Sequence, residues 1–572
     1  MKNICIITDI NGIYGFGHFT RMKFLVSKLQ NKYNFVFSSI NNNSEIFKLN
    51  DINTCKFENI KDYNTYLAII DSREVDSKYI KYLKTFTSVI IIDSIGRERE
   101  LADIVIEMLP NLDSSDEVNI EPFIATILNS NIKPKYDKNA PILVYLGFND
   151  DIKSKCIEII SNIKEKEFII IDIEKESKYS NIKYKSFSSD IFKTPYSAII
   201  TYFGLTAFEC LDAKIPTILL SPTEYHNKLA NIENDIFFNL GFYKEINIEN
   251  AIKNLKNFLE DYNIQSKYLD NTIKIDTFKS IERFETIIEN IKDFKNIKCP
   301  FCDSDDYIRI NRNIESNLYR CNSCKTLFRK YFLPPFTDYS SRYFVEDYKN
   351  QYGKTYEEDV DNLSKLARRR LDKLKQVKPK GKILDIGSAM GFFLNEAKKQ
   401  GYETEGIEIS KYAYDYSVNT LKLNVHNVSL LDFDYKEKEY DIITAWYVVE
   451  HIYNFEKVLD KILYSLKDNG ILSFATPNGY GISGRYNKNY RKIVPTDHAF
   501  ETNPDALDKL LLKYNLKRLY LSNNSVYYNR FCDIFNLKYL KNNFILRPIY
   551  NKVAIKKNIG DTFECIYQKV PN

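Results

Sequence analysis

Residues 382–393 read KILDIGSAMGFF, and this stretch decides the fold of the second half of the chain. Its apolar start predicts a buried strand with Asp385 at its end, and the loop from Gly387 to Gly391 leads into a predicted helix. About twenty residues on, a second predicted strand ends at Glu408, a spacing that suits a carboxylate for ribose hydroxyls. A dinucleotide site would read G-x-G-x-x-G, whereas this loop reads D-x-G-x-x-x-G and needs no pyrophosphate.

The loop resembles motif I of class I S-adenosylmethionine (SAM) methyltransferases. Later runs match the later strands of that family, at residues 440–452 (YDIITAWYVVEHI), 474–478 (FATPN) and 497–500 (DHAF). The resemblance spans about residues 296–572. It implies a class I methyltransferase Rossmann-like domain with SAM as cofactor, and zinc-ribbon members of this family commonly accompany polysaccharide and sugar-modification enzymes.

The same resemblance implies roles for single residues. Gly387 and Gly391 would let the backbone approach the methionine part of the cofactor, Asp385 would orient the loop, and Glu408 would hold the ribose. His451 and His498 are candidate catalytic bases, because an imidazole titrates near neutral pH. The alternative is that the Glu-His pair at 450–451 is structural.

Four cysteines in the middle of the chain form two C-x-x-C pairs separated by eighteen residues: Cys299, Cys302, Cys321 and Cys324. This spacing predicts a zinc ribbon, since each C-x-x-C turn lets two thiolates reach one ion. Four thiolates leave no open position, so we expect structural rather than catalytic zinc. Two disulfides or four free thiols are the alternatives, but the other six cysteines are scattered as in a reduced cytosolic protein.

The first half of the chain alternates short apolar runs with helical patterns, which is typical of parallel α/β sheets. The runs are residues 4–8, 67–71, 89–93, 142–146, 168–171 and 198–201. They predict two sheets, with residues 131–141 as the connector. Ligands of such sheets bind at the carboxyl ends of the strands, so the loops after these runs are candidate sites.

Three of these loops carry a resemblance of their own. They read GIYGFGHFTR at 12–21, YFGLTAFE at 202–209 and IPTILLSP at 215–222. Glycines in the first loop allow a tight turn and close approach of backbone amides to an anion at a helix start. Together the loops resemble the glycosyltransferase-like family that includes the pseudaminic-acid-pathway UDP-sugar hydrolase and spore-coat polysaccharide glycosyltransferases. The resemblance covers about the first 285 residues and implies a GT-B-like pair of Rossmann-type domains.

In that family the G-x-G-H-x-x-R loop lies at the reaction centre, and His18 would act on the attacking water or hydroxyl. The implied substrate-binding residues are Gly15, Gly17, Arg21, Gly147, Gly204, Thr206 and Glu209, the last suited to ribose hydroxyls. Phe203 and Leu205 depart from the family pattern, which has small residues there. The alternative for His18 is a structural helix cap. His226 is a surface residue or a sugar contact.

The net charge of the chain does not indicate a particular class of binding partner. The 81 basic and 76 acidic residues give a net charge of +5 without a dense basic block, so neither nucleic acid nor an anionic membrane is required. The chain starts directly with an apolar strand and has no basic leader, so no signal peptide is expected, and no apolar run reaches membrane-spanning length. These features predict a cytoplasmic protein of about four domain-sized units.

The expected domains are two Rossmann-type domains at 1–135 and 138–288, a zinc ribbon with connector at 296–345, and the methyltransferase at 360–572. We predict a bifunctional enzyme of surface-glycan or nonulosonate-type sugar biosynthesis, in which a UDP-sugar hydrolase or glycosyltransferase is joined to a sugar methyltransferase. Its partners would be a nucleotide-activated sugar and a sugar acceptor. One alternative, motivated by Phe203 and Leu205, makes the first half a non-catalytic nucleotide-sugar-binding module. Another is an RNA methyltransferase, against which the lack of a basic stripe argues.

Overall fold

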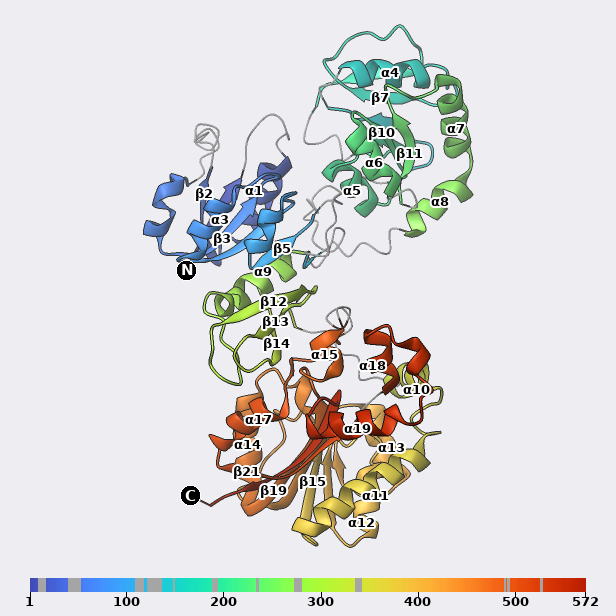
Figure 1. Cartoon of the computed structure of the whole chain (residues 1–572). Coiled ribbons are helices and arrows are strands. Elements are labelled where there is room, and N and C mark those ends of the chain that lie inside the picture. Colours follow the sequence, from blue (N-terminus) through green and yellow to red (C-terminus); the bar gives the residue numbers. More distant parts are fainter. Residues whose placement is uncertain are drawn as a thin grey trace. The chain divides into compact units, whose positions relative to one another are not determined.

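The computed structural model divides the chain into two compact units, Met1–Lys295 and Asn296–Asn572 (Figure 1). The structure describes residues 1–8, 17–39, 53–108, 118–120, 136–147, 150–187, 194–232, 236–271, 280–334, 342–487, 490, 494–524 and 528–571. Within this part of the chain, every helix is too short or too polar to cross a membrane.

The first unit begins with a parallel five-stranded sheet of order β2-β1-β3-β4-β5. Its strands are β1 (Lys2–Thr8), β2 (Tyr33–Ser38), β3 (Thr65–Asp71), β4 (Ser88–Ile92) and β5 (Ile104–Ile106). The strands are almost continuously apolar and buried, as expected for a parallel sheet covered on both faces. Helix α1 (Gly17–Leu29) follows β1, and α3 (Ser77–Lys84) packs on the sheet through Ile80 and Leu83.

A second parallel sheet has the order β11-β10-β9-β6-β7-β8. Its strands are β6 (Ile142–Val144), β7 (Phe168–Ile171), β8 (Ile182–Lys185), β9 (Ala198–Thr201), β10 (Thr217–Ser221) and β11 (Phe238–Phe242). In chain order this is 3-2-1-4-5-6, the doubly wound arrangement. Helices α4 (Asp150–Ile160) and α7 (Ile248–Glu260) pack in one core cluster, and α5 (Leu205–Asp212) and α6 (Glu224–Ile232) contribute to another.

The chain then returns to the first sheet. Helix α9 (Ser280–Asn290) lies within the range expected for the second domain, but it contacts α1 and its last turn bonds to β1 and β3. Lys2 donates a hydrogen bond of 2.6 Å to Glu289, and the Tyr66 hydroxyl donates to the Ile288 carbonyl. The last long helix of the first unit therefore packs against the sheet with which the chain begins.

The second unit opens with a small antiparallel sheet of β12 (Tyr307–Arg312), β13 (Ser316–Cys321) and β14 (Leu327–Tyr331). A fourth strand, β20 (Phe500–Glu501), pairs with β14 although it lies far along the chain. The cysteine-bearing segment is thus joined by backbone hydrogen bonds to the part of the chain that follows it.

The large sheet of the second unit has seven strands in the order β17-β16-β15-β18-β19-β22-β21. They are β15 (Lys382–Ile386), β16 (Glu403–Ile407), β17 (Val425–His426), β18 (Tyr440–Trp446), β19 (Leu466–Pro477), β21 (Leu516–Asn524) and β22 (Thr562–Lys569). The first five are parallel in chain order 3-2-1-4-5, and β22 is antiparallel to both of its neighbours.

Helices cover both faces of this sheet (Figure 1). Drawn in yellow are α11 (Val360–Val377), α12 (Phe392–Lys399) and α13 (Lys411–Asn419), while α14 (Phe455–Ser465) and α17 (Pro504–Leu512) lie on the other face. The predicted α/β fold with parallel Rossmann-like sheets is confirmed. The GT-B-like pairing and the zinc ribbon stay predictions.

Candidate functional sites

His18 lies in a buried network of charged side chains at the carboxyl ends of β1, β3 and β4. Its Nδ1 is 2.6 Å from an oxygen of Asp71, the last residue of β3. Arg21, one turn further along α1, donates from Nε to Asp71 at 2.7 Å and from a terminal nitrogen to Asp93 at 2.6 Å. All four side chains are at most 7% exposed, so His18 is held in one orientation.

The network keeps Asp71 ionised. Burial alone would raise the pKa of Asp71, but the charges of Arg21 and His18 outweigh it and lower the pKa to about 2. Asp71 is therefore ionised at neutral pH and can only accept, while a terminal nitrogen of Arg21 also lies 2.9 Å from Nδ1 of His18. The predicted role of His18 as a general base stays a prediction.

The glycines of the first loop are only partly described. Gly15 lies outside the described residues, and Gly17 begins α1. Sequence reasoning missed Asp71 and Asp93, although a signal existed, because each ends an apolar run. An acid at the end of a parallel strand lies where ligands bind.

The predicted nucleotide-binding residues of the second sheet follow β6 and β9, which are neighbours at the point where the strand order reverses. Gly147 follows β6 with φ +65°, and Gly204 directly precedes α5, which carries Thr206 and Glu209. A crevice at such a switch point, with a helix N-terminus facing it, suits a phosphate-bearing ligand.

Phe203, which departs from the small residue of the family pattern, places its side chain in the core and not at the predicted phosphate position. Phe203 is buried in a cluster with Phe208 and Phe237, at ring distances of 5.6 and 5.8 Å, and so serves the core of the domain. The side chain of Leu205 lies outside the described residues. His226 bonds to the Thr223 hydroxyl at 2.7 Å, and burial lowers its pKa.

The loop from Gly387 to Gly391 after β15, called the glycine loop below, requires glycine at both of its ends. Gly387 and Gly391 have φ of +67° and +80°, in the left-handed region that favours glycine. A Cβ on Gly387 would lie 2.5 Å from Val448, and one on Gly391 would lie 2.6 Å from Leu423. Ala389 between them also has a positive φ of +49°, an uncommon conformation that marks a constrained loop.

Glu408 and Asp385 lie on either side of this loop. Glu408 follows β16 and accepts 2.7 Å hydrogen bonds from the backbone amides of Ala389 and Ser410. Asp385, near the end of β15, accepts from the Thr444 hydroxyl at 2.6 Å, and burial raises its pKa to about 7. The carboxylate that bonds to the loop is thus Glu408, while Asp385 bonds to the neighbouring strand. Their predicted roles toward the cofactor stay predictions.

His451 and His498 are brought together from distant parts of the chain. Their rings are 4.9 Å apart and nearly perpendicular, and each Nδ1 faces a carboxylate: Asp497 at 3.1 Å for His451, and Glu501 at 2.8 Å for His498. Burial lowers the pKa of His451, but Asp497 and Glu450 outweigh this effect and raise it.

The four predicted zinc ligands also converge. Their sulfur atoms lie within 4.8 Å of one another, with 3.5 Å between Cys299 and Cys324 and between Cys302 and Cys321. A disulfide would require about 2.05 Å. A tetrahedron with Zn–S bonds of about 2.3 Å places its sulfurs about 3.8 Å apart, so the cluster fits one zinc ion.

The cysteine-bearing sheet supports the loop that carries His498. Arg329 on β14 is buried and donates from Nε to the His498 carbonyl and from a terminal nitrogen to the Val494 and Pro495 carbonyls, each at 3.1 Å. The Tyr331 hydroxyl donates to the Thr496 carbonyl at 3.0 Å. Sequence reasoning missed this contact, because nothing local in either segment points to the other.

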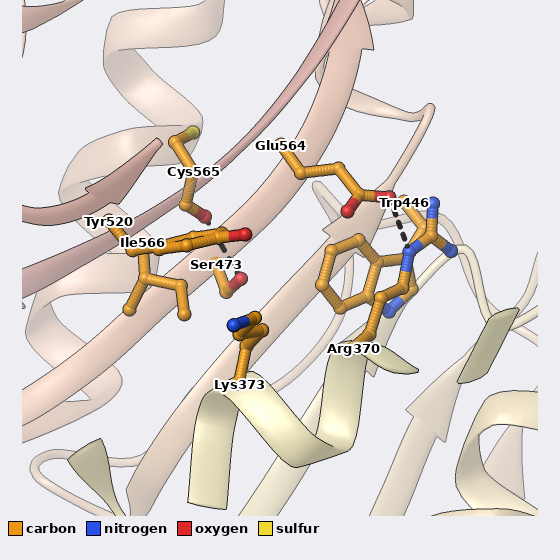
Figure 2. A pocket seen from close by; sticks show the side chains of 8 residues that line it. All are labelled: Arg370, Lys373, Trp446, Ser473, Tyr520, Glu564, Cys565 and Ile566. Atoms are coloured by element: carbon orange, nitrogen blue, oxygen red, sulfur yellow. Dashed lines mark hydrogen bonds and ion pairs between the residues drawn. The ribbon is translucent and has the colours of Figure 1, made fainter. Parts of the chain in front are cut away.

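A small depression lies between α11 and the strands β18, β19, β21 and β22 (Figure 2). Arg370 lies against the indole of Trp446, 4.2 Å from its ring centre, and donates to Glu564 at 2.9 Å. The glycine loop is not among its lining residues. Because the glycine loop takes no part in it, this depression is not a candidate donor site.

Comparison with known proteins identifies the second unit. Residues 356–521 match the family model described as a methyltransferase domain. No curated protein matches the chain. One similar solved structure is a SAM-dependent methyltransferase from Archaeoglobus fulgidus, with 15% identity over 39% of this chain and 98% of that one and a TM-score of 0.29.

Two further structures are similar. A SAM-dependent methyltransferase from Thermotoga maritima, titled a possible histamine N-methyltransferase, has 17% identity over 40% of this chain and 99% of that one, with a TM-score of 0.29. A glycotransferase of kitacinnamycin has 8% identity over 50% of this chain and 98% of that one, with a TM-score of 0.39. The family match shows that the C-terminal part of the chain is a class I SAM-dependent methyltransferase domain. This part of the sequence prediction is confirmed.

Proposed function

We propose that the protein modifies a sugar at two sites, with SAM-dependent methylation in the second unit and nucleotide-sugar hydrolysis or glycosyl transfer in the first. The observation that carries the sugar assignment is the buried group of His18, Arg21, Asp71 and Asp93. It holds an imidazole at the carboxyl edge of one parallel sheet, in a unit whose second sheet reverses its strand order between β6 and β9, where such sheets bind ligands.

In the first unit His18 acts as general base. Its Nε2 takes the proton of a water or sugar hydroxyl while that oxygen bonds to the anomeric carbon. The bond from this carbon to the phosphate oxygen breaks, and UDP leaves with the electron pair. Asp71 stabilises the imidazolium that forms, and backbone amides at the start of α5 face the phosphates.

In the second unit the residues align a donor with an acceptor. Bound SAM supplies an electrophilic methyl group on a sulfonium. Gly387 and Gly391 let the backbone approach the methionine part, Glu408 accepts from the ribose hydroxyls, and Asp385 holds the edge of the neighbouring strand through Thr444. Removal of the acceptor's proton is the role of the site that contains His451 and His498.

The four cysteines hold a structural zinc ion in this proposal. The sulfur separations of 3.5 Å support it, as does the closed set of four thiolates. The role of the ion is to fix the fold of the small sheet, because a segment of this size buries little apolar surface without it. Through Arg329 this sheet then positions the segment that carries His498.

Mass spectrometry of products from the full chain with SAM and a panel of UDP- and CMP-sugars tests the proposal. We expect one sugar to gain a methyl group and UDP to be released, with release lost in His18→Ala and retained in His226→Ala. Calorimetric UDP binding without turnover would show that the first unit is a binding module. Methylation of tRNA with salt-sensitive binding, and of no sugar, would contradict the proposal.

A further inference from the structure

One carboxylate and two imidazoles form a cluster that begins two residues after Val448, the neighbour of Gly387. Glu450 and His451 belong to the short helix η7 (Val449–His451), which follows β18, and His498 precedes β20. One ligand atom from each residue lies within 4.8 Å of the other two. We propose that Glu450, His451 and His498 bind one divalent transition-metal cation, whose open positions take oxygen atoms of the methyl acceptor.

The first argument is an unsatisfied buried carboxylate. Glu450 is 1% exposed, and its Oε2 has no hydrogen-bond partner among the described residues. A buried carboxylate oxygen without a partner is strongly destabilising, whereas a cation supplies the partner that it lacks. The backbone of Glu450 is itself fixed, because its carbonyl accepts a 2.6 Å hydrogen bond from the amide of Ala499.

The second argument is the orientation of the imidazoles. Glu501 lies 2.8 Å from Nδ1 of His498, and Asp497 lies 3.1 Å from Nδ1 of His451. The contact of His498 is a hydrogen bond that favours a proton on Nδ1 and leaves the lone pair on Nε2, whereas Nδ1 of His451 makes no hydrogen bond among the described residues. Histidines that bind metals almost always donate their other ring N–H to such an outer carboxylate, and His498 has one in Glu501.

The ligand set indicates the class of ion. Two imidazoles and one carboxylate suit Mn²⁺, Fe²⁺, Co²⁺ or Zn²⁺, whereas Mg²⁺ and Ca²⁺ prefer oxygen ligands alone. Three protein ligands leave open positions, unlike the closed set of four thiolates. An acceptor hydroxyl on such a cation has a lowered pKa, so the histidines would act as ligands rather than as free bases. The role of the cation toward the acceptor rests on the proposed function. The binding of the cation is independent of it.

The test uses the full chain loaded with one equivalent of Zn²⁺ to fill the thiolate cluster. Mn²⁺ is then added and followed by electron paramagnetic resonance, without SAM or acceptor. We expect one bound Mn²⁺ per chain, with spin-echo modulation from imidazole nitrogen. Glu450→Gln and His498→Asn should each weaken binding at least tenfold.

His426→Asn is the matched control, because His426 is also paired with a carboxylate, Glu405 at 2.7 Å, in the same unit. It should bind Mn²⁺ as the unaltered protein does. Absence of bound Mn²⁺, or bound Mn²⁺ without nitrogen modulation, would overturn the inference even if a variant failed to fold. SAM affinity is measured separately on the same samples. SAM binding without Mn²⁺ binding would overturn the cation site alone, whereas absence of SAM binding would contradict the methyltransferase assignment.

Discussion

At the scale of single residues, Glu408 already accepts hydrogen bonds from backbone amides and can still accept one from a ribose hydroxyl. Its carboxylate accepts the amides of Ala389 and Ser410, one of which belongs to the glycine loop. An ionised carboxylate offers about four lone-pair sites, so ribose hydroxyls can share it. The residue therefore joins the shape of the loop to the binding of the donor.

Substituting Glu408→Gln should weaken SAM binding by about 10- to 100-fold, because hydrogen bonds to a charged group contribute about 1.5–3 kcal/mol. Glutamine keeps the size of the side chain and can still accept the Ala389 amide, so the fold should persist. Isothermal calorimetry measures the effect, and Glu403→Gln on the exposed start of β16 is the control. Unchanged affinity would remove Glu408 from the donor site.

Asp71 is expected to stabilise the first unit in a pH-dependent way. Its folded pKa of about 2 lies below the ordinary 3.8, so its contribution is present above pH 3.8 and is lost as pH falls through 2. Asp71→Asn leaves the Arg21 charge undercompensated and should cost about 3–5 kcal/mol at neutral pH.

Urea unfolding at several pH values measures this contribution. The exposed Asp76→Asn, at the N-cap of α3, should leave stability nearly unchanged, because asparagine caps a helix about as well as aspartate does. Equal effects of the two substitutions would show that the buried network contributes nothing.

At the scale of elements, β14 connects the cysteine cluster to the loop that carries His498. Replacing Arg329 by Gln removes the contacts to the His498, Val494 and Pro495 carbonyls. We expect methyl transfer to fall at least tenfold while SAM binding stays unchanged, because Glu408 and the glycine loop are untouched. Steady-state kinetics with a parallel calorimetric titration separates the two.

Lys330→Gln is the matched control for this element, since successive residues on a strand point to opposite faces. It should leave both methyl transfer and SAM binding unaltered. A loss of SAM affinity in Arg329→Gln would mean that the small sheet supports the whole unit rather than one loop.

Sequence patterns predicted the elements that local signals specify. The strand, loop and helix around Asp385 and the acid at Glu408 follow from apolar runs and fixed spacing over a few dozen residues. The pairing of β14 with β20 could not be predicted, because a two-residue strand shows no alternation and its partner is far away in the chain. The Asp71–His18 contact was missed for the same reason, since tertiary structure alone joins β3 to α1.

At the scale of the whole molecule, two units with their own cores should unfold separately. Calorimetry of the full chain should show two transitions. Asp71→Asn should lower only the transition of Met1–Lys295, and a zinc chelator only that of Asn296–Asn572. A single transition that both treatments lower equally would mean that the chain unfolds as one cooperative body.

The position of β20 near the end of the sequence also has a consequence for folding during synthesis. A ribosome releases β14 long before Phe500 and Glu501 emerge, so the nascent small sheet has an open edge until nearly the whole chain is out. An unpaired edge invites pairing with other chains. Fragments that stop between the two strands are therefore expected to aggregate, and premature stop codons in this interval should yield insoluble product.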